Sequence, residues 1–65
     1  MRNNLKKIRK KLNISQQELA DITGVSRVTI SLIENQKDSP VKSDTIVALV
    51  KGLNVPAHDI FPDFK

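Results

Sequence analysis

Residues 15–35 read SQQELADITGVSRVTISLIEN, and this stretch decides the fold. Its first four residues fit a capping box, in which the Ser15 hydroxyl accepts a hydrogen bond from the Glu18 amide and the Glu18 carboxylate reaches back to the Ser15 amide. Gly24 ends the helix over 16–23, because glycine adopts a left-handed conformation at little cost. Ser26 then caps a second helix over 27–34. Only residues 24–26 separate the two helices, so the turn between them is short and contains glycine.

Apolar residues on the N-terminal side of this stretch predict another helix. They recur at spacings of three and four rather than two, which favours helices over strands despite the abundant valine, isoleucine and threonine. Leu5, Ile8 and Leu12 would form one buried stripe on a helix over 3–11, followed by a turn at Asn13. Within the central stretch, the same spacing makes Ile30 and Ile33 the inward positions.

The C-terminal side predicts a fourth and a fifth helix. Ser43 is the expected cap of the fourth helix, and Asn54 is its expected left-handed C-terminal residue. Gly52 would weaken this helix by about 1 kcal/mol relative to alanine. Pro56 begins a short helix over 56–61, and residues 62–65 form a tail. The side chains expected to be buried here are Ile46, Leu49, Val50, Leu53, Ile60 and Phe61. Residues 1–65 therefore predict a single all-α domain, a compact arrangement of five helices in which the second and third form a helix-turn-helix.

Composition excludes several classes of protein. The 65 residues contain no cysteine, which excludes disulfides, a thiolate zinc site and a cysteine nucleophile. One histidine, His58, cannot hold a metal ion alone. The acidic residues are scattered and no glycine-rich phosphate loop is present, so we expect no enzyme, no cofactor and no metal. The chain shows neither an apolar run of about 20 residues nor a signal peptide, so we expect a cytoplasmic protein with no membrane contact.

Positive charge is concentrated at the N-terminal end of the chain. The net charge is +4, and residues 1–11 carry six basic residues and no acid, whereas residues 12–65 carry five basic residues against seven acids. Such a patch is either a solvated helix face or a surface that meets phosphate. A small basic domain favours nucleic acid as the partner. With two phenylalanines as the only aromatic residues, binding of single strands by base stacking is disfavoured.

The order of these motifs resembles the Cro and phage-repressor family of helix-turn-helix proteins. The resemblance covers residues 3–61 and is carried by several segments in matching order and spacing. The chain departs from the family pattern in a longer loop after Asn35, in Gln36 where glycine is common, and in Gly52 where alanine is commoner. The matching segments are Leu5…Ile8-Arg9, Ser15-Gln16-Gln17-Glu18-Leu19-Ala20, Gly24-Val25-Ser26-Arg27, Thr29-Ile30-Ser31, Ile33-Glu34-Asn35 and Leu53-Asn54-Val55…Asp59-Ile60-Phe61.

The resemblance implies binding of double-stranded DNA, with the helix over 27–34 in the major groove. The side chains expected to contact bases are Arg27, Val28, Ser31 and Leu32. The forked donors of Arg27 match the two acceptors of guanine, and Val28 and Leu32 match the methyl group of thymine. The alternatives are a phosphate contact or simple solvation for Arg27, and packing under the following loop or in a dimer contact for Leu32.

A second group of residues is expected to contact phosphates. Family likeness places Gln16 there, at a helix start where amide groups point outward toward an anion. The family also pairs an arginine on the first helix with a glutamate at the end of the third, which corresponds to Arg9 and Glu34. The alternatives are a solvated Gln16 and two unrelated exposed charges. The full expected phosphate set is Arg9, Gln16, Ser26, Thr29, Asn35 and Lys37.

These expectations combine into a sequence-specific transcription regulator, with repression as its expected role. One half-site offers few contacts, so we expect a dimer on a pseudo-palindromic operator with half-sites about 34–36 Å apart. The homodimer would be weak, formed through the fifth helix and the tail, with no small-molecule effector. The alternative is an antitoxin or another protein-interaction module with the same fold, whose binding would depend little on salt.

Overall fold

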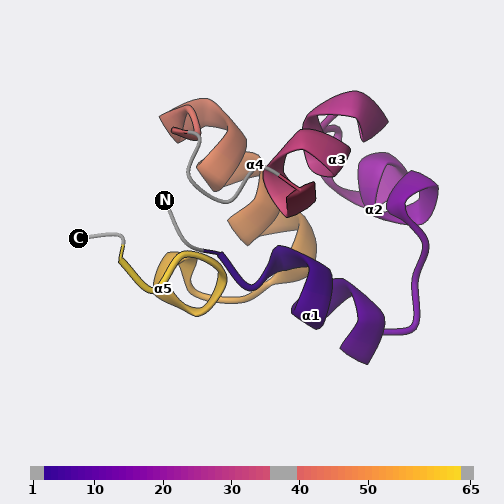
Figure 1. Ribbon diagram of the computed structural model, residues 1–65, viewed down its shortest axis with the longest axis horizontal. Coiled ribbons are helices and arrows are strands. Elements are labelled where there is room, and N and C mark those ends of the chain that lie inside the picture. Colours follow the sequence, from indigo (N-terminus) through magenta and orange to yellow (C-terminus); the bar gives the residue numbers. More distant parts are fainter. Residues whose placement is uncertain (1–2, 36–39, 64–65) are drawn as a thin grey trace.

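Five α-helices make up the regular structure of residues 3–35 and 40–63, which are the residues that the structure, a computed structural model, describes. They are α1 (Leu5–Lys11), α2 (Gln16–Thr23), α3 (Arg27–Asn35), α4 (Ser43–Leu53) and α5 (Ala57–Ile60), as Figure 1 shows. No strand occurs in the described ranges. The prediction of an all-α domain with five helices is confirmed.

The ends of α2 follow the local sequence signals. The Glu18 amide donates to the Ser15 hydroxyl at 3.0 Å, and the Ser15 amide donates to the Glu18 carboxylate at 2.9 Å. Gly24 ends α2 with a φ of 76°, and Asn54 ends α4 with a φ of 57°. The capping box and both left-handed ends are confirmed.

Several predicted helix limits differ from the observed ones by one or two residues. α1 begins at Leu5 rather than at residue 3, because the backbone of Asn4, with a φ of −110° and a ψ of 19°, is not helical. The Asn3 side chain donates to the Ile33 carbonyl at 2.9 Å, and the Asn4 amide donates to the Ile60 carbonyl at 2.7 Å. These bonds attach the start of the chain to the end of α3 and to α5.

The starts of α4 and α5 also differ from the prediction. Ser43 is the first residue of α4 rather than its cap, and the capping position is held by Lys42, whose side chain makes no capping bond. α5 spans four residues and is preceded by Pro56, whose ψ of 149° is extended rather than helical. At the end of α3, the helix continues through Asn35.

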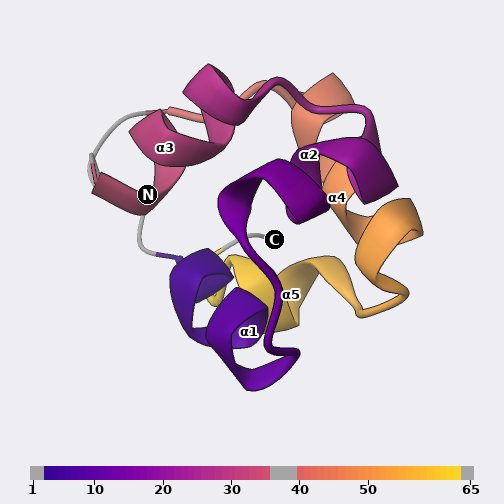
Figure 2. The same ribbon diagram turned by 90° about the vertical axis from the view of Figure 1, so that its right-hand side faces the viewer.

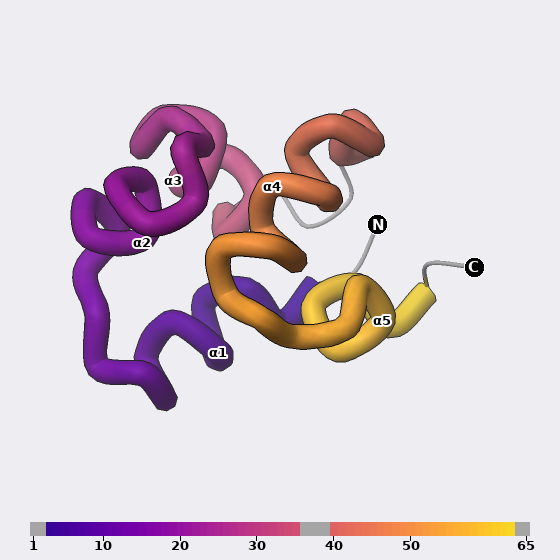
Figure 3. Tube along the Cα trace, turned by 180° about the vertical axis from the view of Figure 1, so that it is seen from behind, coloured from indigo at the N-terminus to yellow at the C-terminus, as the bar shows by residue number. Residues whose placement is uncertain are grey.

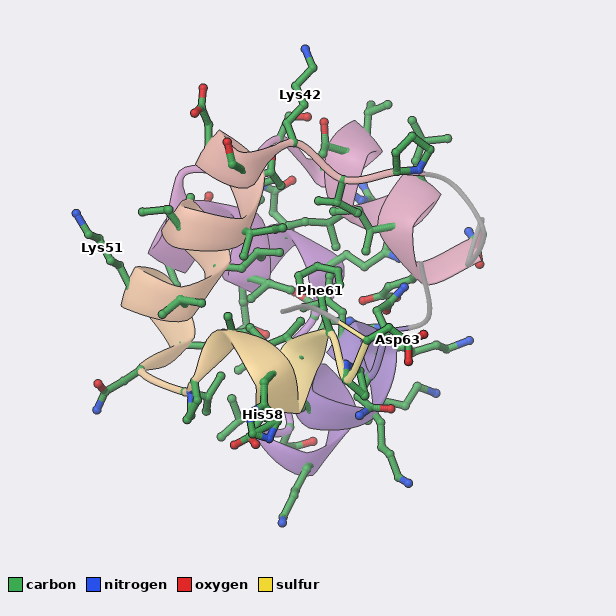
Figure 4. All side chains as sticks on the ribbon, turned by 90° about the vertical axis from the view of Figure 1, so that its left-hand side faces the viewer. Lys42, Lys51, His58, Phe61 and Asp63 are labelled. Carbon is green, nitrogen blue, oxygen red and sulfur yellow. The ribbon has the colours of Figure 1, made fainter. Side chains whose placement is uncertain are left out.

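The core forms where all five helices meet. Its fully buried side chains include Phe61, which lies at the centre of the view in Figure 4. Leu12 was expected in the buried stripe of α1, but its side chain is 51% exposed because it follows the last helical residue. Val50 and Leu53 pack against the core while only partly buried. The buried apolar residues are Leu5, Leu19, Val25, Ile30, Ile33, Ile46, Leu49, Ile60 and Phe61.

Gly52 lies where α4 approaches the end of α2. A Cβ atom placed on Gly52 would lie 2.6 Å from Cγ2 of Thr23 and 2.9 Å from its Cα. These distances are far below the 3.5–4.0 Å or so of an ordinary carbon contact. Glycine at this position therefore permits the close packing of α4 on α2, which a reading of helix propensity alone does not reveal.

α3 and the pair α1 and α5 lie on opposite sides of the domain. The views in Figures 1, 2 and 3 differ by turns about the vertical axis, and in each of them α3 lies above while α1 and α5 lie below. The outer side of α3 and the outer side of α1 and α5 therefore face different directions.

Candidate nucleic-acid interface

α3 has one buried and one exposed face. Ile30 is fully buried and Ile33 is 5% exposed, so both anchor the helix on the core. On the other face Val28 is 69% exposed and Leu32 is 47% exposed, although both are apolar. Arg27 is exposed and Ser31 is half-buried. The four side chains expected to contact bases thus lie at or near the surface.

The start of α3 is held by its own hydroxyl groups. The Thr29 amide donates to the Ser26 hydroxyl at 3.1 Å, and the Ser26 and Thr29 hydroxyls are hydrogen-bonded at 2.8 Å. The Ile30 amide donates to the Ser26 carbonyl at 3.0 Å. Ser26 therefore caps α3 as expected, and this fixes the direction in which the first turn presents Arg27 and Val28.

The two helices place one residue of α2 beside the exposed face of α3. A shallow hollow of about 350 Å³ is lined by Gln16 together with Arg27, Val28, Ser31 and Leu32. Residues separated by up to 16 positions in the chain therefore share one surface. We call these five residues the α3 reading face.

A buried ion pair fastens α1 to α3 behind this face. Arg9 Nε donates to one carboxylate oxygen of Glu34 at 2.8 Å, and a second Arg9 nitrogen donates to the other oxygen at 3.1 Å. The side chains are 12% and 1% exposed, respectively. A third Arg9 nitrogen donates to the Ile14 carbonyl at 2.9 Å. Gln16 Nε2 also donates to Glu34, at 3.1 Å, so one carboxylate links α1, α2 and α3.

A comparison with protein families identifies this arrangement. A family model described as helix-turn-helix matches residues 5–60, which is most of the chain. The chain belongs to the helix-turn-helix family of the Cro and phage-repressor type. No curated protein matches it. Proteins of this family are DNA-binding transcription regulators, so the chain is one as well, and its partner is double-stranded DNA.

The ionisation of Glu34 follows from its neighbours in the helix-turn-helix domain. Burial raises the pKa of this carboxyl, but hydrogen bonds from Arg9 and Gln16, with the charges of Arg9 and Lys6, lower it by more. The pKa of Glu34 therefore lies below its ordinary value of 4.5. The hydrogen bond to Glu34 raises the pKa of Arg9. Both side chains are charged at neutral pH, so Glu34 adds no uncompensated negative charge to the interface.

The Gln16 side chain has a different environment from the one expected. It was expected to point its amide donors outward, but it is half-buried and one of its hydrogens is directed at Glu34. A primary amide carries two donor hydrogens. The second hydrogen and the backbone amide at the start of α2 therefore remain as donors near the α3 reading face.

The other expected contact residues of α3 differ in their exposure. Thr29 is half-buried, and Asn35 is exposed with its amide donating to the Ser31 hydroxyl at 3.2 Å. Lys37 lies outside the described residues. Leu32 also borders a second hollow of about 310 Å³ with Pro40 and Val41. Its position therefore allows both a base contact and packing against the segment that precedes α4.

Sequence reasoning missed the role of Asn3. Its side chain joins the start of α1 to the last turn of α3 through the Ile33 carbonyl. No signal in the sequence indicates this bond, because its partner lies thirty positions away. Within the described residues, no helix is long and apolar enough to cross a membrane, and no group of three metal-binding side chains gathers.

Proposed function

We propose that the chain is a sequence-specific repressor that inserts α3 into the major groove of double-stranded DNA. The observation that carries this proposal is the exposure of Arg27, Val28 and Leu32 on a helix that Ile30 and Ile33 anchor from behind. The major groove is about 12 Å wide and admits one α-helix. Exposed apolar side chains on that helix gain a partner in thymine methyl groups, whereas in water they have none.

Each residue of the α3 reading face has a distinct role in this proposal. Arg27, in the first turn of α3, grips the two acceptors of a guanine with its forked donors. Val28 and Leu32 contact thymine methyl groups. Ser31 contacts a base edge or the adjacent phosphate. These contacts specify sequence, because only base edges carry sequence information directly.

Phosphate contacts set the register of the domain on the duplex. Gln16 offers its second amide hydrogen and its backbone amide, at the positive end of the α2 dipole. Ser26 and Thr29 lie at the corresponding end of α3. Asn35 and Lys37 meet the backbone beyond the end of α3. Arg9, held by Glu34, presents its remaining donors to the same strand, so the buried pair both fixes the angle of α3 and orients the arginine.

Two copies of the domain bind one operator in this proposal. The half-sites of a two-fold operator lie about 34–36 Å apart, and the longest dimension of the domain is 26 Å. Two domains therefore fit side by side on one face of the duplex. The apolar side chains of α5 and its end, Ile60 and Phe61, are fully buried in the core. Because these two side chains add no apolar surface to a dimer contact, the dimer is weak and forms mainly on DNA.

Selection of duplexes from a random pool tests the proposal. We expect enrichment of one sequence with two inverted half-sites about 10 base pairs apart. Binding of that duplex should weaken steeply with salt, with a log–log slope of about −0.9 for each phosphate neutralised. If no sequence is enriched, or if the affinity for DNA does not change with salt concentration, the proposed repressor function is refuted and the protein-interaction module is favoured.

A further inference from the structure

An apolar groove lies between α1 and α5, on the side of the domain away from the α3 reading face. It has a volume of about 550 Å³, and its floor is formed by Ile8, Leu12, Leu53 and Val55. Lys7 and Lys11 border it on α1, and His58 and Asp59 border it on α5. Figure 4 shows His58 in the lower part of the domain, far from Lys42 at the top. We call this feature the α1–α5 groove.

Leu12 distinguishes this groove from ordinary surface. Single exposed apolar residues are normal on any protein. Leu12, however, is 51% exposed and shares its hollow with three other aliphatic side chains that are each only partly buried. An apolar surface gathered in a concave site, rather than scattered, is typical of a place where another chain docks.

The lysines at the rim define the chemistry of the occupant. Lys7 and Lys11 are four positions apart, so they project from one face of α1, and both are exposed. Among the described residues, the only ion pair joins Arg9 to Glu34, so neither lysine has a carboxylate within ion-pair distance. Asp59 is the one carboxylate among the groove's lining residues, so the two lysines leave the rim with excess positive charge. An occupant with carboxylates beside its apolar residues complements this excess better than a purely apolar or basic one.

We propose that the α1–α5 groove docks a short segment of a partner protein that carries apolar and acidic residues together. The apolar side chains of this segment fill the floor around Leu12, and its carboxylates pair with Lys7 and Lys11. Because the groove faces away from α3, the partner binds while the domain is on DNA. This simultaneous binding rests on the proposed function, whereas docking to the free chain does not.

A library of random 16-residue peptides, displayed and selected on the immobilised full chain, tests the proposal. We expect the recovered peptides to combine Leu, Ile or Phe with Asp or Glu. Fluorescence anisotropy then compares two variants with matched exposure, Leu12→Asp in the groove and Ile22→Asp outside it, at 51% and 52%. Leu12→Asp should weaken peptide binding about tenfold, the effect expected from losing a half-buried leucine contact. Ile22→Asp should leave the affinity unchanged.

The lysine rim is tested without touching the apolar floor. The double variant Lys7→Gln and Lys11→Gln should weaken binding of the same peptide severalfold. The matched control is Lys42→Gln with Lys51→Gln, two exposed lysines that point away from the domain in Figure 4 and do not border the groove. Circular dichroism verifies that each variant is folded.

Four results would overturn the proposal. They are a selection that enriches no peptide, an equal loss with Ile22→Asp, a recovered peptide without acidic residues, and self-association of the free chain that Leu12→Asp abolishes. The last result would make a second copy of the chain the occupant. Displacement of the peptide by the duplex recovered from the pool would refute simultaneous binding. Because docking is measured without DNA, its failure is distinct from a failure to bind DNA.

Discussion

Replacing Gly52 with alanine tests whether packing or helix propensity decides the stability of α4. Propensity alone predicts that Gly52→Ala stabilises the domain by about 1 kcal/mol. The structure predicts the opposite sign, because the new methyl group would lie 2.6 Å from Cγ2 and 2.9 Å from Cα of Thr23. Such overpacking costs about 1–3 kcal/mol. The cost exceeds the gain, so we expect net destabilisation of about 1 kcal/mol.

Urea denaturation followed by circular dichroism measures this change. With a slope of about 1 kcal/mol per molar urea for a domain of this size, the midpoint should fall by about 1 M. The melting temperature should fall by roughly 4–8 °C. A midpoint that rises by a similar amount would refute the argument, because it would show that α2 and α4 separate at no cost.

A second substitution identifies which atoms are responsible. Thr23→Ser removes Cγ2 but leaves the backbone of residue 23 in place. In this background Gly52→Ala should still destabilise, though less than in the wild type, because the contact with Cα remains. Complete relief would mean that the side chain alone caused the conflict.

The remaining predictions concern the anchor of α3, its outer face and the buried ion pair. Ile30→Ala should lower the free energy of unfolding by about 2–5 kcal/mol, a large share of a total of about 3–10 kcal/mol, and a urea midpoint equal to that of the wild type would contradict this. Arg27→Ala should weaken binding of the selected duplex by about 1–3 kcal/mol and relax preference at one base pair; an equal loss on every sequence would assign Arg27 to a phosphate. Gln16→Ala should weaken all duplexes alike in the same anisotropy assay, leaving the sequence preference unchanged. Because the folded pKa of Glu34 is lowered, its contribution is full above its ordinary pKa of 4.5 and is lost as the pH falls through the lowered value. Urea midpoints measured from pH 6 downward should therefore decline less steeply in Glu34→Gln than in the wild type, and parallel curves would contradict this account.

The exposure of Leu12 and the contact between Arg9 and Glu34 are two features that the spacing of residues in the sequence does not predict. Periodicity placed Leu12 in a buried stripe, but α1 ends one residue earlier and its side chain is half-exposed. Periodicity describes a continuing helix, so it fails at the residue where the helix stops. Arg9 and Glu34 were paired only through family resemblance, because nothing in the spacing of two charges twenty-five positions apart indicates a contact.

The sequence by itself determined where the helices begin and end around the turn. The capping box at Ser15 and Glu18, the left-handed residues Gly24 and Asn54, and the inward placing of Ile30 and Ile33 all depend on neighbours within about one helical turn. Such interactions join residues that are close together in the chain, so the sequence alone predicts them. Only the tertiary structure decided that Gln16 bonds to Glu34, that Thr23 packs closely against Gly52, and that a groove opens beside Leu12. These features depend on how whole helices approach one another, which is settled by packing across the core.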